Sequence, residues 1–409
     1  MRKMSSRWMV GCCLGGVLLP FFVNAQEVAP QGIRLLDDRL VLSPYVNLEV
    51  IYDSNFNLAR KQSARGELED LIYRINPGVN LTYQGDQWGA AGSLWYSYNW
   101  YQKYHGSMNT TRWGERLRVY RESPKGWRFT ASQGYMESDT YDALYVTEHG
   151  NGVWRNRSQF DANGALSYAC SERLTLALNA MYSEVWYGWN NQLYGQLISW
   201  KQWGIGGDIM HKLTARSSVV LAGMYHEYYT GAKQSTFSTT SRGYTLQGGL
   251  MSRLTDRVRY RALVGASMYD YGGEQTLAPS YSLDASWVIN KKWAMTAAGG
   301  GYFQPSEREF NQRKVIYTLA LGTTYQPMKR VRLTLDGVYR HEDNQNVANR
   351  TSMYGNYQAD QYTARFKANY QFLRYASVYG AAEYNLQTSN MEWDDWERYR
   401  LSLGLSLKY

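Results

Sequence analysis

The chain has 409 residues, of which 44% are hydrophobic, 19% charged and 15% aromatic, and its formal net charge is +9. A disordered chain would be poor in aromatic residues and rich in charge, so this composition excludes intrinsic disorder. The mean hydropathy of -0.53 is too polar for a bundle of membrane helices, and three Cys are too few for a disulfide scaffold. Two classes remain: a soluble all-β protein and a membrane β-barrel.

Residues 1–25 have the features of a secretory signal peptide. Basic residues begin the segment, an apolar stretch follows, and small residues precede a cleavage position after Ala25. A lipoprotein signal ending at Cys12 is the alternative, although it leaves almost no apolar core before the cysteine. Removal of this leader leaves Cys170 as the one thiol, so no intramolecular disulfide can form.

From residue 43 to 409 apolar and polar residues alternate, which is the period of a β-strand with two different faces. Residues 26–42 do not alternate cleanly, and we expect a periplasmic N-terminal tail or a short plug there. The final strand shows the pattern most clearly. One of its faces carries Tyr399, Leu401, Leu403, Leu405, Leu407 and Tyr409, and the other carries Arg398, Arg400, Ser402, Gly404, Ser406 and Lys408.

Connections between the alternating stretches are short and long in turn. Eight short polar turns and nine long polar loops make 17 connections, hence about 18 strands, with 16–18 as the expected range. This order predicts a transmembrane up-and-down antiparallel β-barrel, with short periplasmic turns, long extracellular loops and both termini in the periplasm. Lipid offers no hydrogen-bond partner, so such a barrel must close. A soluble propeller would show blade-length repeats, and the sequence has none.

Two stretches carry a resemblance to a known family. Residues 43–57 read SPYVNLEVIYDSNFN, and residues 70–104 read DLIYRINPGVNLTYQGDQWGAAGSLWYSYNWYQKY. An opening strand ending in Tyr-Asp-Ser-Asn, then an Asp, an Asn-Pro-Gly and a Tyr-rich third strand resemble the outer-membrane β-barrel porins found with exopolysaccharide export systems. The resemblance implies a Gram-negative outer membrane and a part in polysaccharide export, with export components as partners. It assigns no functional residue.

The final strand also resembles the C-terminal signal that the barrel-assembly machinery reads. The residues of this assembly signal are Tyr399, Leu401, Leu403, Leu405, Leu407 and Tyr409. The expected partners are therefore outer-membrane lipid and this machinery, while the oligomeric state stays open.

If the apolar face of each strand meets lipid, the polar face lines a lumen, which is too wide at about 18 strands for side chains to fill. The bases expected on this face are Arg116, Arg118, Arg259, Arg261, Arg332, Arg340, Arg365, Lys367, Arg398 and Arg400. Charged rings in a pore select ions by sign, so this excess of bases predicts a weak anion preference. Alternatively, most of these Arg pair with lumenal acids such as Asp284 and Glu383 and brace the wall.

Aromatic residues in the long loops are candidates for stacking on sugars. They are Trp186, Trp189, Trp393 and Trp396. The alternative is that these rings belong to the aromatic girdle that membrane barrels carry at each interface.

Catalytic and metal chemistry is not indicated. The five His are scattered and none lies in a recognisable nucleophile motif, no Cys and His have metal-ligand spacing, and the bases are too dispersed for a nucleic-acid patch. The sequence therefore predicts a channel without a cofactor, for polysaccharide export or passive diffusion of small hydrophilic solutes. The alternative is a structural or adhesive barrel with an occluded lumen and displayed loops.

Overall fold

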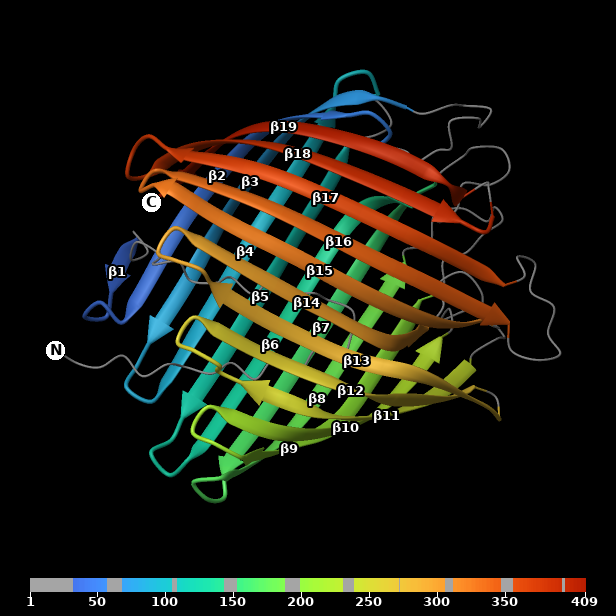
Figure 1. Ribbon diagram of the computed structural model, residues 1–409. Coiled ribbons are helices and arrows are strands. Elements are labelled where there is room, and N and C mark those ends of the chain that lie inside the picture. The colour runs from blue at the N-terminus through green and yellow to red at the C-terminus, as the bar shows by residue number, and fades with distance from the viewer. Residues whose placement is uncertain are drawn as a thin grey trace.

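The computed structural model describes residues 32–56, 68–104, 109–142, 153–187, 199–230, 239–271, 273–305, 312–346, 356–391 and 394–409. These residues form one sheet rolled into a barrel (Figure 1). The strands are β1 (Ile33–Leu35), β2 (Leu40–Asp53), β3 (Asp70–Gln84), β4 (Trp88–Tyr101), β5 (Thr110–Glu122), β6 (Trp127–Asp142), β7 (Val153–Ala169), β8 (Leu174–Tyr187), β9 (Trp200–Lys212), β10 (Ser217–Thr230), β11 (Thr239–Ser252), β12 (Val258–Tyr271), β13 (Glu274–Val288), β14 (Trp293–Pro305), β15 (Gln312–Met328), β16 (Val331–Asn346), β17 (Tyr357–Gln371), β18 (Ala376–Ser389) and β19 (Trp396–Lys408).

From β2 to β19 each strand is antiparallel to the next in the chain. The last strand then pairs with β2, from Lys408 opposite Tyr45 to Arg400 opposite Asp53, and this pairing closes a ring of 18 strands. The short strand β1 lies outside the ring, where it pairs with the first residues of β2. The predicted all-β fold, with about 18 antiparallel strands in a closed barrel, is confirmed.

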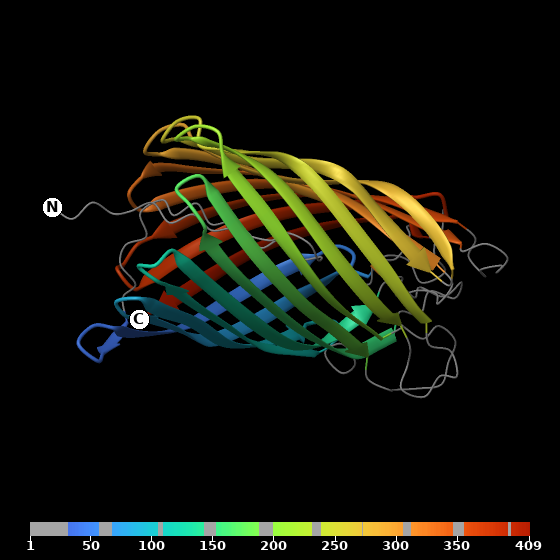
Figure 2. The ribbon, with the colours of Figure 1, turned by 90° about the horizontal axis from the view of Figure 1, so that it is seen from below.

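The connections lie at the two ends of the barrel as the alternation predicts. Short turns gather at the end of the barrel where the C-terminus lies, and we call the opposite end of the strands the outer end (Figures 1 and 2). Among the described residues there is no helix of the length and apolarity needed to cross a membrane.

The outward face of the barrel is an apolar belt between two rings of aromatic residues. In β19, Leu401 and Leu403 are 56% and 63% exposed, although both lie in the middle of a paired strand. Neighbouring rings contact one another at the outer end in the pairs Tyr73–Trp100, Trp113–Tyr135, Trp203–Tyr225, Tyr339–Tyr362 and Tyr384–Tyr399. The corresponding pairs at the short-turn end are Tyr83–Trp88, Trp127–Tyr168 and Trp293–Tyr325. This arrangement matches the lipid-facing surface of membrane barrels.

Some strands extend beyond the predicted limits. β2 begins at Leu40, inside the segment expected to be a tail, and β8 continues to Tyr187, so Trp186 lies in a strand and not in a loop. The backbone hydrogen bonds between two strands continue beyond the apolar belt. There both faces of a strand are polar, so the alternation of apolar and polar residues no longer marks the strand. Residues 1–31, which include the expected signal peptide, lie outside the described residues.

Candidate functional site: the inner wall of the barrel

Hydrogen bonds that pass over intervening strands identify the inner face. The Tyr228 hydroxyl of β10 donates to the carbonyl oxygen of Phe303 in β14 at 2.9 Å, and Gln247 Nε2 of β11 donates to Ser280 Oγ of β13 at 2.7 Å. Only the concave side of a curved sheet brings such positions together. The registers of neighbouring strands then assign one face of each strand to the bore.

By this assignment the ten bases singled out from the sequence lie on the inner face of their strands. Carboxylates lie within 4 Å of at least five of them, in the pairs Arg261–Asp208, Arg340–Glu342, Arg365–Glu383, Arg398–Asp53 and Arg400–Asp53. The remaining residues of the set are Arg116, Arg118, Arg259, Arg332 and Lys367, of which Arg118 and Arg259 also have interaction partners. Carboxylates thus offset part of the positive charge and brace the wall, and an excess of bases is left.

The most buried carboxylate of these pairs, Asp53, lies at the seam where the last strand meets β2. Asp53 is fully buried, and both of its carboxylate oxygens accept hydrogen bonds from Arg398. Arg400 lies 3.4 Å from the same carboxylate and 3.5 Å from Glu383. Asn55 donates to a main-chain carbonyl of β19 at 2.9 Å. The Tyr-Asp-Ser-Asn sequence at the end of β2 therefore fastens the first and last strands of the ring together.

A second polar cluster continues along the same wall toward β5. Arg74 donates to Glu49 Oε2 at 3.0 Å and through Nε to Asn99 Oδ1 at 2.7 Å, and Asn99 donates to Thr110 Oγ1 at 2.9 Å. This cluster joins four adjacent strands, β2 to β5. The two clusters together form one continuous polar wall, from β17 through the seam to β5, which we call the charged wall.

Bases outnumber acids on the charged wall. From β17 to β3 the inner face carries six bases (Arg74, Arg365, Lys367, Arg398, Arg400, Lys408) against four acids (Glu49, Asp53, Asp70, Glu383), a net charge of +2. The inner face of β5 adds Arg112, Arg116 and Arg118 against Glu122, another +2. A solute moving along this wall therefore meets a positive field, which a low-dielectric surround strengthens.

The opposite wall is less charged and is partly folded into the bore. β13 and β14 pair over only seven positions, from Ser282–Gly300 to Val288–Ala294, whereas every other pair of adjacent ring strands has at least nine. Pro279 lies in the part of β13 that pairs with β12 but not with β14, as expected for a residue that lacks an N–H and is confined in sheets to edges. After Gly300, β14 no longer pairs with β13, although it stays paired with β15.

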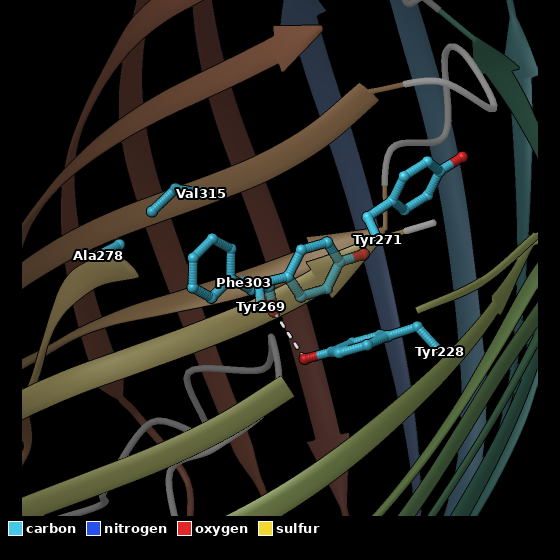
Figure 3. Close-up of a cluster of buried hydrophobic side chains, with 6 residues drawn as sticks. All are labelled: Tyr228, Tyr269, Tyr271, Ala278, Phe303 and Val315. Carbon is cyan, nitrogen blue, oxygen red and sulfur yellow. Dashed lines mark hydrogen bonds between the residues drawn. The ribbon is translucent and has the colours of Figure 1, made fainter. Parts of the chain in front are cut away.

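The outer end of β14 packs against the inside of the barrel. Phe303 lies on the same side of β14 as the outward-facing Trp293 and Met295, yet its ring stacks on the inward-facing Tyr269, with centroids 4.9 Å apart (Figure 3). The members of this cluster are Tyr228, Tyr269, Tyr271, Ala278, Phe303 and Val315, all buried. The ends of β14 and β15 therefore occupy part of the bore beside β10 to β13, and we call this feature the inturned hairpin.

The four tryptophans singled out for sugar stacking do not gather at one place. Trp186 faces outward, with its ring centroid 6.0 Å from that of Tyr135, so it joins the outer aromatic ring and does not line the bore. Trp396 lies on the inner face at the outer end of β19. Trp189 and Trp393 lie outside the described residues.

Asp53, Arg74 and Arg112 contribute to the wall but were not among the site residues chosen from the sequence. The alternation of the two strand faces could have identified Arg112. Arg112 precedes Arg116 by four positions in β5, so both residues must lie on the same face. Asp53 likewise shares the face of Glu49.

Groups suited to compact chemistry are dispersed in the described part of the chain. No three His, Cys, Asp or Glu side chains come together there as they would around a metal ion. His341 Nδ1 lies 2.9 Å from Asp360, whereas His226 is buried on the inner face beside Tyr228. What the arrangement offers is a long polar surface that can attract and guide charged solutes.

Comparison with known proteins finds likeness in structure and none in sequence. No known protein family matches the sequence, and no curated protein is similar to it. The siderophore receptor PirA of Pseudomonas aeruginosa is 10% identical, with 93% of this chain and 81% of PirA covered and a TM-score of 0.44. The FrpB iron transporter of Neisseria meningitidis is 7% identical, with 90% and 81% covered and a TM-score of 0.45. Neither likeness says what this chain binds.

Proposed function

We propose that this chain is a channel of the Gram-negative outer membrane that passes hydrophilic solutes through its bore. The observation that carries the proposal is that one barrel combines two surfaces. Its outward face is an apolar belt bounded at each end by a circle of aromatic residues, and its inner wall is polar. Such a surface is stable only in lipid, and an 18-strand ring is wide enough to leave water inside. The leader at residues 1–25 and the assembly signal in β19 support export to that membrane.

The charge of the inner wall supports a weak preference for anions. At least five of the ten bases singled out above have carboxylate neighbours, so the field is moderate. In planar bilayers with a KCl gradient, the reversal potential should have the sign of an anion-selective pore. A potential of cation sign would overturn this part of the proposal, and the absence of any conductance would overturn the channel itself.

Polysaccharide export is the transport function that the family resemblance favours. The Tyr-Asp-Ser-Asn and Asn-Pro-Gly sequences that carry the resemblance lie in β2, β3 and the connection between them, and both strands contribute to the charged wall. Deletion of the gene should leave polymer inside the cell if the channel exports it. Normal secretion in the deletion strain would argue for passive uptake of small solutes instead.

A structural or adhesive barrel is the second candidate, and the inturned hairpin favours it. Phe303 and Val315 fill part of the bore at the outer end, where they are 6% and 7% exposed. If this hairpin shuts the bore, reconstituted protein would show no current at any voltage, while it would still insert into vesicles.

A further inference from the structure

Four successive short turns of the barrel repeat one pattern of four residues. An apolar residue comes first, then Ser, Thr or Asn, then a variable residue, then a base. The turns join β7 to β8, β9 to β10, β11 to β12 and β13 to β14, so they lie side by side along the short-turn rim (Figure 1). Their sequences are Cys170-Ser171-Glu172-Arg173, Leu213-Thr214-Ala215-Arg216, Leu254-Thr255-Asp256-Arg257 and Ile289-Asn290-Lys291-Lys292.

The same hydrogen bonds hold all four turns. In the β9–β10 turn, Oγ1 of Thr214 accepts from the main-chain N–H groups of Arg216 and Ser217 at 3.2 and 3.0 Å. Ser171, Thr255 and Asn290 accept in the same way from the second and third residues that follow them. Such side-chain caps fix the main chain of a turn, so every base starts from an equivalent position on the rim.

The two arginines at the centre of this series also link neighbouring turns. Nη1 of Arg216 donates to the carbonyl oxygen of Leu254, and Nη1 of Arg257 donates to the carbonyl oxygen of Ile289, both at 3.3 Å. Neighbouring turns are two strands apart, which is about 10 Å. A guanidinium has more N–H donors than this bond uses, and both arginines are exposed, so each can also bind an anion.

The charge of the rim is concentrated on this side. We call residues 212–216, 252–257 and 289–292 the basic arc. Its bases are Lys212, Arg216, Arg253, Arg257, Lys291 and Lys292, and Asp256 is the one acid in these three ranges. On the other side of the rim, the turns at 36–39, 85–87 and 123–126 hold Asp37, Asp38 and Asp86 against Arg39 and Lys125. Charge that served solubility alone would be distributed around the rim, so this unevenness points to an anionic ligand.

The basic arc lies directly beyond the lipid-facing belt. Lys292 precedes Trp293, which belongs to the aromatic ring at the short-turn end. Leu213 and Leu254 are 57% and 54% exposed, although each stands beside a capped turn residue and close to a base. At a bilayer interface such leucines enter the acyl region while the long basic side chains reach the phosphates. The combination fits a lipid better than a soluble anion.

We propose that the basic arc binds anionic phospholipids of the leaflet that surrounds the short-turn end. Bases of adjacent turns contact the phosphate oxygens, and Leu213 and Leu254 contact the acyl chains. A zwitterionic phospholipid binds less tightly because its ammonium group cancels part of the attraction. The inference requires a barrel in lipid, as the proposed function does, but it does not depend on what passes through the bore.

The test measures lipid binding to the full mature chain, refolded in detergent. Phosphatidylglycerol and phosphatidylethanolamine with the same acyl chains are added separately, and native mass spectrometry gives the fraction of barrel that carries lipid. Phosphatidylglycerol should bind at least about tenfold more tightly. The triple variant Arg216→Gln, Arg257→Gln and Lys292→Gln should lose most of this preference. Equal binding of the two lipids by the wild-type barrel would overturn the proposal.

A matched triple variant separates the basic arc from net charge. Arg39→Gln, Arg121→Gln and Lys125→Gln remove as many bases from the other side of the short-turn end. This variant should keep the preference of the wild-type barrel. An equal loss of preference in both triple variants would show that only the total charge matters and would overturn the assignment to the arc.

A further comparison separates a lipid from other anions. Leu213→Ser combined with Leu254→Ser keeps every base and should weaken phosphatidylglycerol binding several-fold. Glycerophosphoglycerol, the same headgroup without acyl chains, should not displace the lipid at equal concentration. Displacement by it, or unchanged binding in the leucine variant, would indicate a site for soluble phosphate or an acidic protein and would overturn the lipid assignment. A barrel that inserts into vesicles but shows no lipid preference sinks this inference alone, whereas failure to insert sinks the proposed function.

Discussion

At the scale of single residues, the sequence gives the type of side chain but not its partner. Asp53 and Arg398 are 345 positions apart, and only the closing register between β19 and β2 brings them together. Trp95 was equally hard to place, because Tyr96 and Trp100 on the opposite face of β4 obscure the period-two signal with aromatic residues on both sides. In contrast, Leu401 and Leu403 alternate with small polar residues and could be assigned directly.

The buried carboxylate of Asp53 should contribute several times more to the free energy of unfolding than an exposed ion pair does. Asp53→Asn removes the carboxylate that pairs with Arg398 and leaves Arg400 with Glu383 alone. Loss of one partner of a buried ion pair costs about 3–5 kcal/mol. We expect about 3 kcal/mol, the lower end of this range, because the arginine side chains are 21% and 25% exposed. Urea unfolding of the barrel refolded in lipid vesicles measures this change.

The control is an ion pair of similar length that lies in solvent. Arg128 and Glu122 are 2.7 Å apart and their side chains are 38% and 53% exposed. Glu122→Gln should therefore cost less than about 1 kcal/mol. If Asp53→Asn also lowered the free energy of unfolding by less than about 1 kcal/mol, the seam would not depend on this carboxylate.

At the scale of strands, alternation gave the number and direction of the elements correctly, but it could not show that a strand leaves its neighbour. Phe303 fits the alternation of β14 as an outward-facing residue, and nothing in its local sequence shows that it packs inside the barrel. Pro279 in β13 is a sequence signal for a strand segment that lacks a neighbour on one side. The alternation of apolar residues does not contain this signal.

Releasing the inturned hairpin should widen the channel. Phe303→Ala removes the ring that stacks on Tyr269, at a cost of about 3–5 kcal/mol to the packed state. The outer half of β14 can then pair with β13 by continuing the existing register, and the single-channel conductance should rise. Phe366→Ala, on the outward face of β17 and 45% exposed, is the control and should leave the conductance unchanged. An unaltered conductance in Phe303→Ala would mean that the hairpin does not limit the pore.

At the scale of the whole molecule, the fold follows from one requirement, that a sheet with an apolar outer face leaves no edge in lipid. The leucines of β19 and the aromatic rings at both ends were sufficient to predict the barrel, because these signals repeat on every strand. The arrangement of the bore was not predictable to the same extent, because curvature and the inward turn of β14 decide which walls approach one another. The function proposed here depends on lipid outside the barrel and water inside it.

Labelling of two adjacent residues tests this claim most directly. In a Cys170→Ser background, Ser402→Cys and Leu403→Cys place single thiols on opposite faces of β19, and a charged maleimide is applied to the protein in outer-membrane vesicles. The thiol at position 402 should react because it faces water in the bore, and the thiol at 403 should be protected by lipid until urea unfolds the chain. Rapid labelling at 403 together with protection at 402 would contradict the account.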